Sequence, residues 1–516
     1  MPTLSSTTFD LFIVGGGING TGIAADAAGR GLSVGLCEQG DLAGATSSAS
    51  SKLIHGGLRY LEHKEFRLVK EALAERETLL RAAPHLVQPL RFTLPHLKHL
   101  RPAWMLRTGL FMYDHLSKRV SLPGSKSVKF GPNSPLKPEI RKGFMYSDCW
   151  VDDARLVILN AVAARRKGAD IRTRTRCIGA RRLSDRQVWE IKLENVLDHS
   201  VETLYAKAMV NAAGPWAERL FDEALTEPSS RHLRLIKGSH IVVPKFHDWP
   251  GAFILQNNDG RIVFVLPFQD DYNLIGTTDK AYEGDPQSVK IDDEEIDYLL
   301  DVVNNHFVKR LERKDIVATY SGVRALCDDE STDPSAMTRD YTLDLSAPQE
   351  QTPLLSVFGG KITTYRKLAE AALARLAPWF SQMGPSWTHT MTLPGASQHT
   401  PDLAALRELL EELYPAFPER LLNRYARAYG TLAIRFLGNA QTPEDLGHDF
   451  GHGLYQREVD YLVREEWAHT AEDILWRRTK LSLRFTAEEK DALETYLATQ
   501  RLPGLANNAQ RELREA

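Results

Sequence analysis

Cysteine is scarce in this chain of 516 residues. Its four cysteines, Cys37, Cys149, Cys177 and Cys327, lie far apart in the sequence and form no C-x-x-C pair. This spacing excludes the common cysteine-based metal and redox motifs, and it argues against a network of disulfides. We therefore expect a reducing compartment and no metal site.

Long apolar runs are also missing. No stretch reaches the roughly 18 consecutive apolar residues that a membrane-spanning helix needs, and residues 1–8 lack the basic and apolar segments of a signal peptide. Any membrane contact is therefore expected at the bilayer surface. An excess of positive charge is absent too, because the net charge is −3, and this gives no reason to expect a nucleic-acid partner.

The start of the chain has the pattern of a βαβ unit. Residues 9–14 are an apolar run, residues 15–22 are rich in glycine, residues 23–31 are rich in alanine, and residues 32–38 predict a second strand. A chain of this length exceeds the size at which one hydrophobic core stops growing, so two or three domains are expected.

The later segments favour three kinds of structure. Residues 233–278 alternate in the manner of strands, and beyond Pro394-Gly395 the pattern is helical almost throughout. The sequence thus predicts an α/β fold, in which a Rossmann-like nucleotide-binding domain is interrupted by a mostly β domain and followed by an all-helical C-terminal domain.

Local signals predict further elements. We expect helices at 62–82 and 156–167, a loop at 120–145, and strands at 169–180, 188–210 and 354–358. In the C-terminal part, Thr400-Pro401 and Thr442-Pro443 have the pattern of a cap residue before proline at the first helical position, and Thr486 with Glu489 forms a capping-box pattern.

The glycine-rich turn satisfies G-x-G-x-x-G with Gly15, Gly17 and Gly20. These glycines allow a tight turn, backbone approach to a pyrophosphate and close helix–strand packing, and the helix N-terminus supplies N–H groups to the anion. Glu38 ends the second strand, where it can hold the ribose hydroxyls. Alternatively, the glycines could form a purely structural turn and Glu38 could be an ordinary surface carboxylate. The combination of strand, glycine-rich turn, helix and acidic residue nevertheless indicates a dinucleotide site.

The motif suits both NAD and FAD, and its N-terminal position favours FAD only mildly. The residues that follow are compatible with FAD, and their resemblance to a known family decides between the two cofactors. Polar residues 46–52 offer the hydroxyls and N–H groups that an isoalloxazine edge and a ribityl chain need. Gly56-Gly57 and Gly359-Gly360 permit the backbone to approach a flat ring, although each pair alone would be explained by a tight turn.

Six blocks of sequence carry a resemblance to a known family: residues 45–61, 237–240, 276–279, 320–324, 338–341 and 358–366. In composition and order they closely resemble the FAD-dependent glycerol-3-phosphate dehydrogenases. The resemblance covers residues 9–395, and the helical tail resembles the family more loosely. One departure is Ala325, where the family commonly has proline, and it concerns loop rigidity.

The resemblance implies FAD as the cofactor, with Gly359-Gly360, Lys361 and Thr363 closing over the flavin. A positive charge near the pyrimidine end would stabilise the reduced ring. The predicted cofactor-binding residues are Gly15, Gly17, Gly20, Glu38, Thr46, Ser47, Ser51, Lys52, Leu53, His55, Gly57, Leu58, Ala213, Gly214, Gly359, Gly360, Lys361 and Thr363.

The resemblance also implies a reaction, the oxidation of sn-glycerol 3-phosphate to dihydroxyacetone phosphate by hydride transfer from C2 to flavin N5. The phosphate needs multidentate cationic capture, for which arginine is well shaped. We assign Arg59, Tyr60 and Arg339 to the phosphate, Arg324 to the reacting hydroxyl, and Lys361 to the same pocket. A lone arginine would otherwise be a solvated surface residue.

The hydroxyl also needs a proton acceptor. His240 is our candidate base, because histidine titrates near neutrality, although a histidine beside a strand is more often structural. Arg324 is its rival for polarising the hydroxyl. Asp279 is expected either to orient the site or to cap a turn.

The electron acceptor is expected to be a membrane quinone. Residues 97–122 carry Trp104, Phe111 and other large apolar side chains between basic residues, which suits an amphipathic segment at a bilayer interface. An ordinary helix packed on the core is the alternative. With the resemblance, the pattern favours a cytoplasmic protein attached peripherally to the inner face of the cell membrane.

Three alternative functions stay open. They are a glycerol-3-phosphate oxidase that uses oxygen, a non-catalytic flavin-binding subunit, and an NAD-linked dehydrogenase. A homodimer is expected from the family.

The predicted domain boundaries follow from these patterns. They are residues 1–90, 150–225 and 319–390 for three parts of the FAD-binding domain, 91–149 for a cap or membrane-facing insertion, 226–318 for a β-rich substrate domain, and 391–516 for the helical C-terminal domain.

Overall fold

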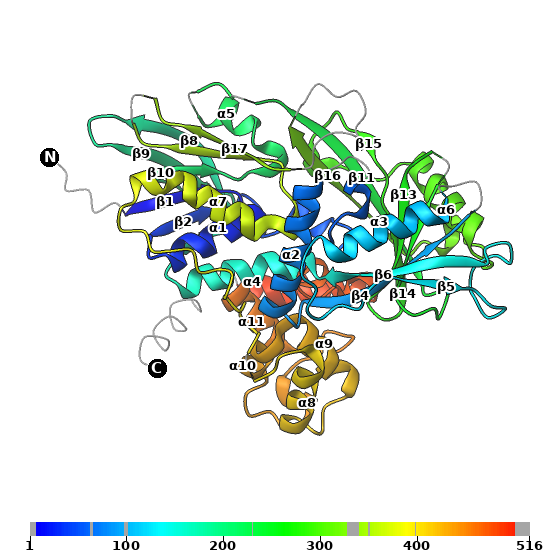
Figure 1. The fold of residues 1–516 in the computed structure, drawn as a ribbon. Coiled ribbons are helices and arrows are strands. Elements are labelled where there is room, and N and C mark those ends of the chain that lie inside the picture. Colours follow the sequence, from blue (N-terminus) through cyan, green and yellow to red (C-terminus); the bar gives the residue numbers. More distant parts are fainter. Residues whose placement is uncertain are drawn as a thin grey trace. The chain divides into compact units, whose positions relative to one another are not determined.

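A computed structural model describes residues 7–61, 65–97, 102–225, 227–229, 231–257, 259–327, 340–348, 351–397 and 399–500. The chain divides into two compact units, residues 1–393 and 394–516 (Figure 1). The larger unit holds two sheets with their helices, and the smaller unit is helical.

The first sheet is built on parallel strands. In the order β17-β18-β10-β1-β2-β7, strand β1 pairs in parallel with both β10 and β2, while β17 is antiparallel to β18. Its strands are β1 (Thr8–Val14), β2 (Val34–Cys37), β7 (Asp170–Arg172), β8 (Thr175–Leu183), β9 (Val188–Asn195), β10 (Val201–Asn211), β17 (Thr342–Ser346) and β18 (Leu354–Phe358). Parallel neighbours need crossover connections, and the predicted βαβ unit is confirmed.

Helix α1 (Ile18–Gly29) forms the first crossover and is buried along most of its length. It contacts α4 (Asp153–Arg166) and α7 (Tyr365–Leu376) (Figure 1). The alanines of α1 and Gly22 allow this close packing, since a Cβ at Gly22 would lie 2.6 Å from the Tyr365 ring. Helix α1 therefore has its N-terminus fixed at the end of β1 by neighbours from distant parts of the chain.

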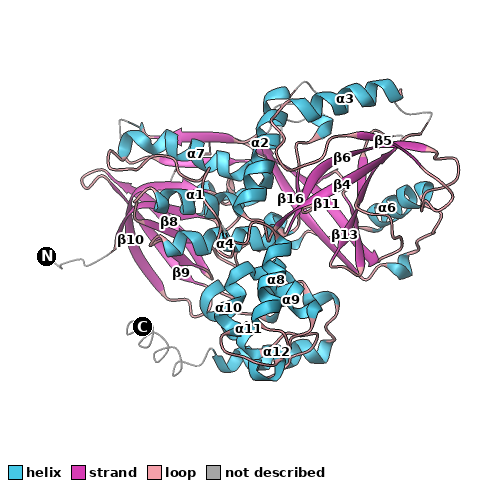
Figure 2. Cartoon of the chain, turned by 60° about the horizontal axis from the view of Figure 1, so that its bottom comes forward, coloured by secondary structure: helices cyan, strands magenta, loops and turns pink. Residues whose placement is uncertain are grey.

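The second sheet has ten strands, in the order β15-β11-β14-β13-β12-β4-β6-β3, with β16 beside β11 and β5 beside β6 (Figure 2). Its strands are β3 (Leu53–Ile54), β4 (Val87–Pro95), β5 (Lys126–Lys129), β6 (Lys142–Val151), β11 (Leu233–Pro244), β12 (Ala252–Gln256), β13 (Ile262–Phe268), β14 (Tyr272–Gly276), β15 (Lys280–Ala281) and β16 (Ala318–Cys327). Helix α6 (Asp293–His306) packs on it through an apolar cluster. The other α-helices in the described residues of this unit are α2 (Phe66–Ala82), α3 (Ala103–His115) and the short α5 (Arg219–Glu223).

Strand pairing departs from the predicted subdivision of this unit. Strands β4 and β6 fall largely in the predicted insertion but pair with each other and connect to β12 and β3. Strand β16, predicted to lie in the third part of the FAD-binding domain, pairs with β11. The predicted loop at 120–145 is also wrong in part, because it contains β5 and the start of β6. Local periodicity identifies strands, but it does not say which distant strand each one meets.

The smaller unit contains α8 (Leu403–Leu413), α9 (Glu419–Tyr429), α10 (Ala433–Leu437), α11 (Gln456–Glu466) and α12 (Ala487–Gln500). Aromatic rings of α9, α10 and α11 meet in its core. The predicted helix starts at Thr442 and Thr486 are confirmed. The predicted start at Thr400 is wrong, because Asp402 caps α8 by accepting a hydrogen bond from the Ala405 N–H.

Candidate active site

The glycine-rich turn lies against the end of β10. Gly15 has a φ of +117°, and a Cβ there would lie 2.4 Å from the Ala212 carbonyl oxygen. A Cβ on Gly20 would lie 1.9 Å from the Gly15 carbonyl oxygen, whereas one on Gly17 would meet the Ser47 Oγ at 3.2 Å. The first and third glycines are therefore required by backbone packing, and they leave the N-terminus of α1 open to an anion.

Glu38 stands beside this turn. Its two carboxylate oxygens accept the Gly16 N–H at 2.7 Å and the Gly40 N–H at 2.8 Å. Burial raises the pKa of Glu38 against the opposing effect of these bonds. An ionised carboxylate accepts about four hydrogen bonds, so Glu38 retains acceptor capacity for a ribose hydroxyl pair. The residues at this turn fit the adenosine and pyrophosphate part of a dinucleotide.

The polar segment after β2 folds over the start of α1. Ser47 Oγ accepts the Ile18 N–H at 3.0 Å, and Thr46 Oγ1 donates to the Val323 carbonyl at 2.6 Å. The predicted cofactor ligand Lys52 is 1% exposed, and its ammonium forms an ion pair of 2.7 Å with Asp153. The Lys52 side chain therefore anchors the segment to α4.

The second glycine pair reaches the same place from the far end of the unit. Asn19 on α1 donates to the Gly359 carbonyl at 3.1 Å, and a Cβ on Gly360 would lie 2.8 Å from the Asn19 Nδ2. The Thr363 hydroxyl accepts the His55 N–H at 3.3 Å. The structure thus brings together the turn at 15–20, the segment at 46–58 and the turn at 359–363, which the sequence analysis assigned to one cofactor.

Lys361 and Tyr60 lie close to this junction. The Lys361 Nζ stands 4.4 Å from the centroid of the Tyr60 ring. Arg339 and the side chain of Arg59 lie outside the described residues. Ala213 and Gly214 follow the end of β10 after one intervening residue, and a Cβ on Gly15 would lie 3.0 Å from the Ala213 N.

His240 is held on β11, between β16 and β14. It is paired with Tyr320 on one side and Gly276 on the other. The His240 and Tyr320 rings stack with centroids 4.8 Å apart, and a Cβ on Gly276 would lie 2.2 Å from His240 Cδ2. The His240 Nε2 lies 2.9 Å from the Ser51 Oγ. The imidazole thereby joins the second sheet to the polar segment after β2.

The charge state of His240 differs from the expectation that it titrates near neutrality. The side chain is 3% exposed, and burial, followed by the nearby charges of Lys52 and Arg324, lowers its pKa to about 3. A neutral imidazole is therefore present at neutral pH, with one ring nitrogen able to accept a proton. The Nδ1 has no hydrogen-bond partner within the part of the chain that the structure describes.

Arg324 lies on β16 next to the loop after β14. Its Nη2 donates to the Thr278 carbonyl at 3.0 Å and lies 3.2 Å from the Asp279 Oδ1. A Cβ on Gly238 would lie 2.6 Å from the same Nη2, so Gly238 leaves room for the guanidinium. Of the two roles considered for Asp279, the contact supports orientation of a site residue.

Three residues at this site were missed by the sequence analysis as individual candidates. Tyr320 stacks on His240, Thr278 accepts and donates hydrogen bonds behind Arg324, and Glu295 accepts from Thr278. Tyr320 and Thr278 lie inside sequence blocks that were recognised. Glu295 carried a different signal, because Asp292 with Glu295 has the pattern of a capping box and forms one in the structure.

The turn at 15–20, the segment at 46–58 and the turn at 359–363 together form a cradle for a cofactor, and comparison with known proteins agrees with this interpretation. A family model described as FAD dependent oxidoreductase matches residues 10–366, and one described as the C-terminal domain of alpha-glycerophosphate oxidase matches residues 386–500. Fold and site therefore define an FAD-dependent oxidoreductase, and the expected cofactor is confirmed.

Comparison with individual relatives indicates which kind of FAD-dependent oxidoreductase this chain resembles. The chain is 57% identical to the aerobic glycerol-3-phosphate dehydrogenase of Escherichia coli (strain K12), across 97% of this chain and 100% of the relative. It is 59% identical to a glycerol-3-phosphate dehydrogenase of Pseudomonas tolaasii, across 95% of each. It is also 51% identical to the D-erythritol 1-phosphate dehydrogenase of Brucella abortus (strain 2308), across 94% of this chain and 97% of the relative.

One solved structure supports the same assignment, and a second shares the fold alone. The glycerol-3-phosphate dehydrogenase of Bacillus halodurans complexed with FAD matches with a TM-score of 0.71 and 26% identity, covering 96% of this chain and 95% of that one. The L-alpha-glycerophosphate oxidase of Mycoplasma pneumoniae with FAD bound shares the fold, with a TM-score of 0.59, 19% identity, and coverage of 75% and 99%. The chain belongs to the FAD-dependent glycerol-3-phosphate dehydrogenase family, as its sequence blocks predicted.

The substitution Gly20→Ala tests the cradle. Its Cβ would overlap the Gly15 carbonyl oxygen, so the turn must open and FAD affinity is expected to fall at least about tenfold. Flavin absorbance per mole of purified protein measures the effect. Gly131→Ala is the control, because its Cβ would meet nothing within 4 Å. Full flavin content in Gly20→Ala would contradict the assignment.

The lowered pKa of His240 predicts a dependence of stability on pH. The unfolded histidine titrates near its ordinary value of 6.5 and the folded one near 3, so the unfolded state binds the proton first. Stability is thus lost as the pH falls below the unfolded pKa. Between about pH 7 and about pH 5, the wild type should lose about 2 kcal/mol more than His240→Gln. Urea unfolding followed by tryptophan fluorescence measures this difference, and parallel pH curves would contradict it.

Proposed function

We propose that this enzyme oxidises sn-glycerol 3-phosphate to dihydroxyacetone phosphate and passes the electrons to a membrane quinone. The observation that carries the proposal is that a buried neutral imidazole, His240, and a partly exposed guanidinium, Arg324, lie on neighbouring strands beside the cofactor segment. His240 contacts Ser51 of the cofactor segment, and Arg324 lies on the strand next to it. The substrates named for the relatives, at 57% and 59% identity, support the same choice.

We assign different roles in the oxidation of the alcohol to His240 and Arg324. When bound, FAD supplies the acceptor for the hydride that leaves the carbinol carbon. We assign His240, which is neutral at working pH, as the acceptor of the hydroxyl proton. Arg324, oriented by Asp279 and the Thr278 carbonyl, holds the hydroxyl oxygen and favours its deprotonated form. Arg324 as the sole polarising group is the rival assignment.

The phosphate is assigned to a cationic pocket. Lys361 and Tyr60 are already adjacent, and they provide a cation and a hydroxyl donor on one side. Arg59 and Arg339 are proposed to complete the pocket with bidentate contacts, which suit a phosphomonoester.

The relative that acts on D-erythritol 1-phosphate raises a second candidate substrate. Both compounds would present a phosphomonoester and a secondary alcohol to the same residues. The longer polyol would require additional space in the site beyond the reacting carbon. A direct assay with each compound distinguishes the two substrates.

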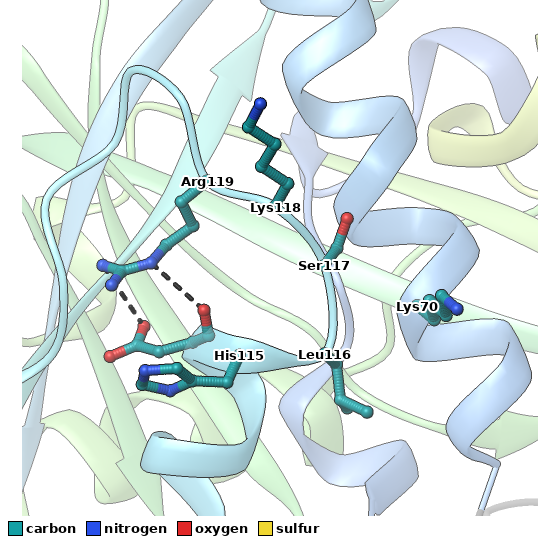
Figure 3. A pocket seen from close by; sticks show the side chains of 7 residues that line it. Lys70, His115, Leu116, Ser117, Lys118 and Arg119 are labelled. Carbon is teal, nitrogen blue, oxygen red and sulfur yellow. Dashed lines mark hydrogen bonds and ion pairs between the residues drawn. The ribbon is translucent and has the colours of Figure 1, made fainter.

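Helix α3 is proposed to contact the membrane surface. Trp104 is 69% exposed and Phe111 is 62% exposed, while Leu106 and Leu110 are buried toward the protein. Beyond the C-terminal end of α3, a hollow is lined by Lys70, Lys118 and Arg119, of which Arg119 pairs with Asp114 (Figure 3). Exposed aromatic side chains beside cations suit the interface of an anionic bilayer.

No helix among the described residues is long and apolar enough to span a bilayer. We propose peripheral attachment to the inner face of the cell membrane, where a quinone is within reach. We also propose that the protein forms a homodimer, on the basis of its resemblance to the family.

Anaerobic reduction of the bound flavin tests the proposed reaction. Adding glycerol 3-phosphate should bleach the flavin absorbance, because the hydride is transferred without another acceptor. Glycerol and lactate, which lack the phosphate, should bleach it at least about a hundredfold more slowly. Persistent colour with glycerol 3-phosphate would exclude the reaction, and faster bleaching by D-erythritol 1-phosphate would reassign the substrate. Oxygen uptake compared with quinone reduction then separates an oxidase from a dehydrogenase.

Co-sedimentation with vesicles of anionic phospholipid tests the role of α3. The double substitution Trp104→Ser and Phe111→Ser removes two exposed aromatic side chains, so binding should weaken at least about tenfold. Leu197→Ser is a matched control, because Leu197 is 58% exposed and lies outside α3. Unaltered binding of the double variant would remove α3 from the membrane contact.

A further inference from the structure

Thr278 carries a buried hydroxyl directly behind the candidate catalytic arginine. The residue is 1% exposed. Its Oγ1 donates to the Glu295 carboxylate at 2.6 Å and accepts the Ser239 N–H at 2.9 Å. The hydroxyl is thus used both as a donor and as an acceptor of hydrogen bonds, and these two bonds fix its rotation.

Glu295 ties this hydroxyl to two other elements. Its Oε1 also accepts from the Ser239 hydroxyl at 3.0 Å, and its Oε2 pairs with Lys237 at 2.7 Å. The Asp292 N–H donates to the same carboxylate through the capping box at the start of α6. The carboxylate is therefore a fixed point that joins α6 to β11 and to the loop after β14.

The carbonyl of Thr278 contacts the candidate catalytic arginine. It accepts the Arg324 Nη2 at 3.0 Å, and the neighbouring Asp279 lies 3.2 Å from the same nitrogen. The same carbonyl accepts from the Thr277 hydroxyl at 3.1 Å, and the Thr278 N–H donates to the Ser239 carbonyl at 3.4 Å. The bond from the Thr278 hydroxyl to Glu295 adds a further restraint on the residue whose carbonyl holds the guanidinium.

From this geometry we propose that Thr278 is a positioning residue for the reaction. Its hydroxyl, bound by Glu295, holds the carbonyl that sets the orientation of Arg324 toward the reacting alcohol. The inference rests on the proposed function, because it assigns Arg324 to that alcohol. A group acting on the transition state loses much of its effect when displaced by a fraction of an ångström.

Thr278→Val and Thr278→Ser form a matched pair of variants. Valine keeps the shape but removes the hydroxyl, so kcat for glycerol 3-phosphate should fall about tenfold, while KM changes less than about twofold. Serine restores the hydroxyl and should recover most of the turnover. Flavin content and Tm are measured for both. Thr479→Val is the control for loss of a buried threonine hydroxyl, since Thr479 donates to the Ile474 carbonyl in the helical unit.

A double substitution separates positioning from general damage. In an Arg324→Lys background the carbonyl no longer holds a guanidinium, so Thr278→Val should lower kcat further by less than about twofold. A full additional tenfold loss would overturn the inference, as would unchanged kcat in Thr278→Val, or equal losses in the valine and serine variants. If glycerol 3-phosphate fails to bleach the wild-type flavin, the proposed function fails. If it bleaches wild type and Thr278→Val at the same rate, the positioning role alone fails.

Discussion

The close contact between the glycine-rich turn and the end of β10 is the constraint on which the site depends. Gly15 approaches the Ala212 carbonyl, and Gly20 approaches Gly15, at distances that exclude any side chain. This contact places the N-terminus of α1 at the edge of the first sheet. Ser47 and Asn19 then connect α1 to the polar segment and to the second glycine pair, so the whole cradle is assembled on a single helix end.

Buried charges hold the outer parts of this cradle in place. Lys52 with Asp153, and Arg76 with Asp148, are ion pairs whose side chains are almost completely removed from water. Asp148 also accepts the hydroxyl of Tyr113, which in turn accepts the Gly56 N–H at 2.8 Å. Such pairs contribute little net stability compared with apolar packing, but removing one partner is costly. Their position at the edges of the cofactor segment indicates a role in fixing one conformation of the backbone.

The parts of the fold that the sequence predicted are those with local causes. The βαβ unit, the strand at 354–358 and the caps at Thr442 and Thr486 follow from periodicity and turn chemistry within a few residues. The pairing of β4, β6 and β16 could not be read in this way, because it depends on contacts across much of the chain. Thr400 was misassigned because both Thr400 and Asp402 are good cap residues, and the helix begins after the second.

The same distinction applies to the site. The glycines and Glu38 were predicted because their spacing is itself the signal, and His240 and Arg324 were predicted through resemblance. The contact of His240 with Ser51, across 189 residues of sequence, and the burial that lowers its pKa could not be inferred from composition. Glu295 was visible as a helix cap, but its role toward Thr278 appears only when α6 is packed on the sheet.

The imidazole of His240 occupies the volume that a side chain at position 276 would fill. The two positions therefore share one space, and the sheet has no spare room to enlarge either of them alone. Any side chain at position 276 would displace the imidazole, so the absence of a side chain on β14 is a condition for an aromatic ring at position 240 of β11.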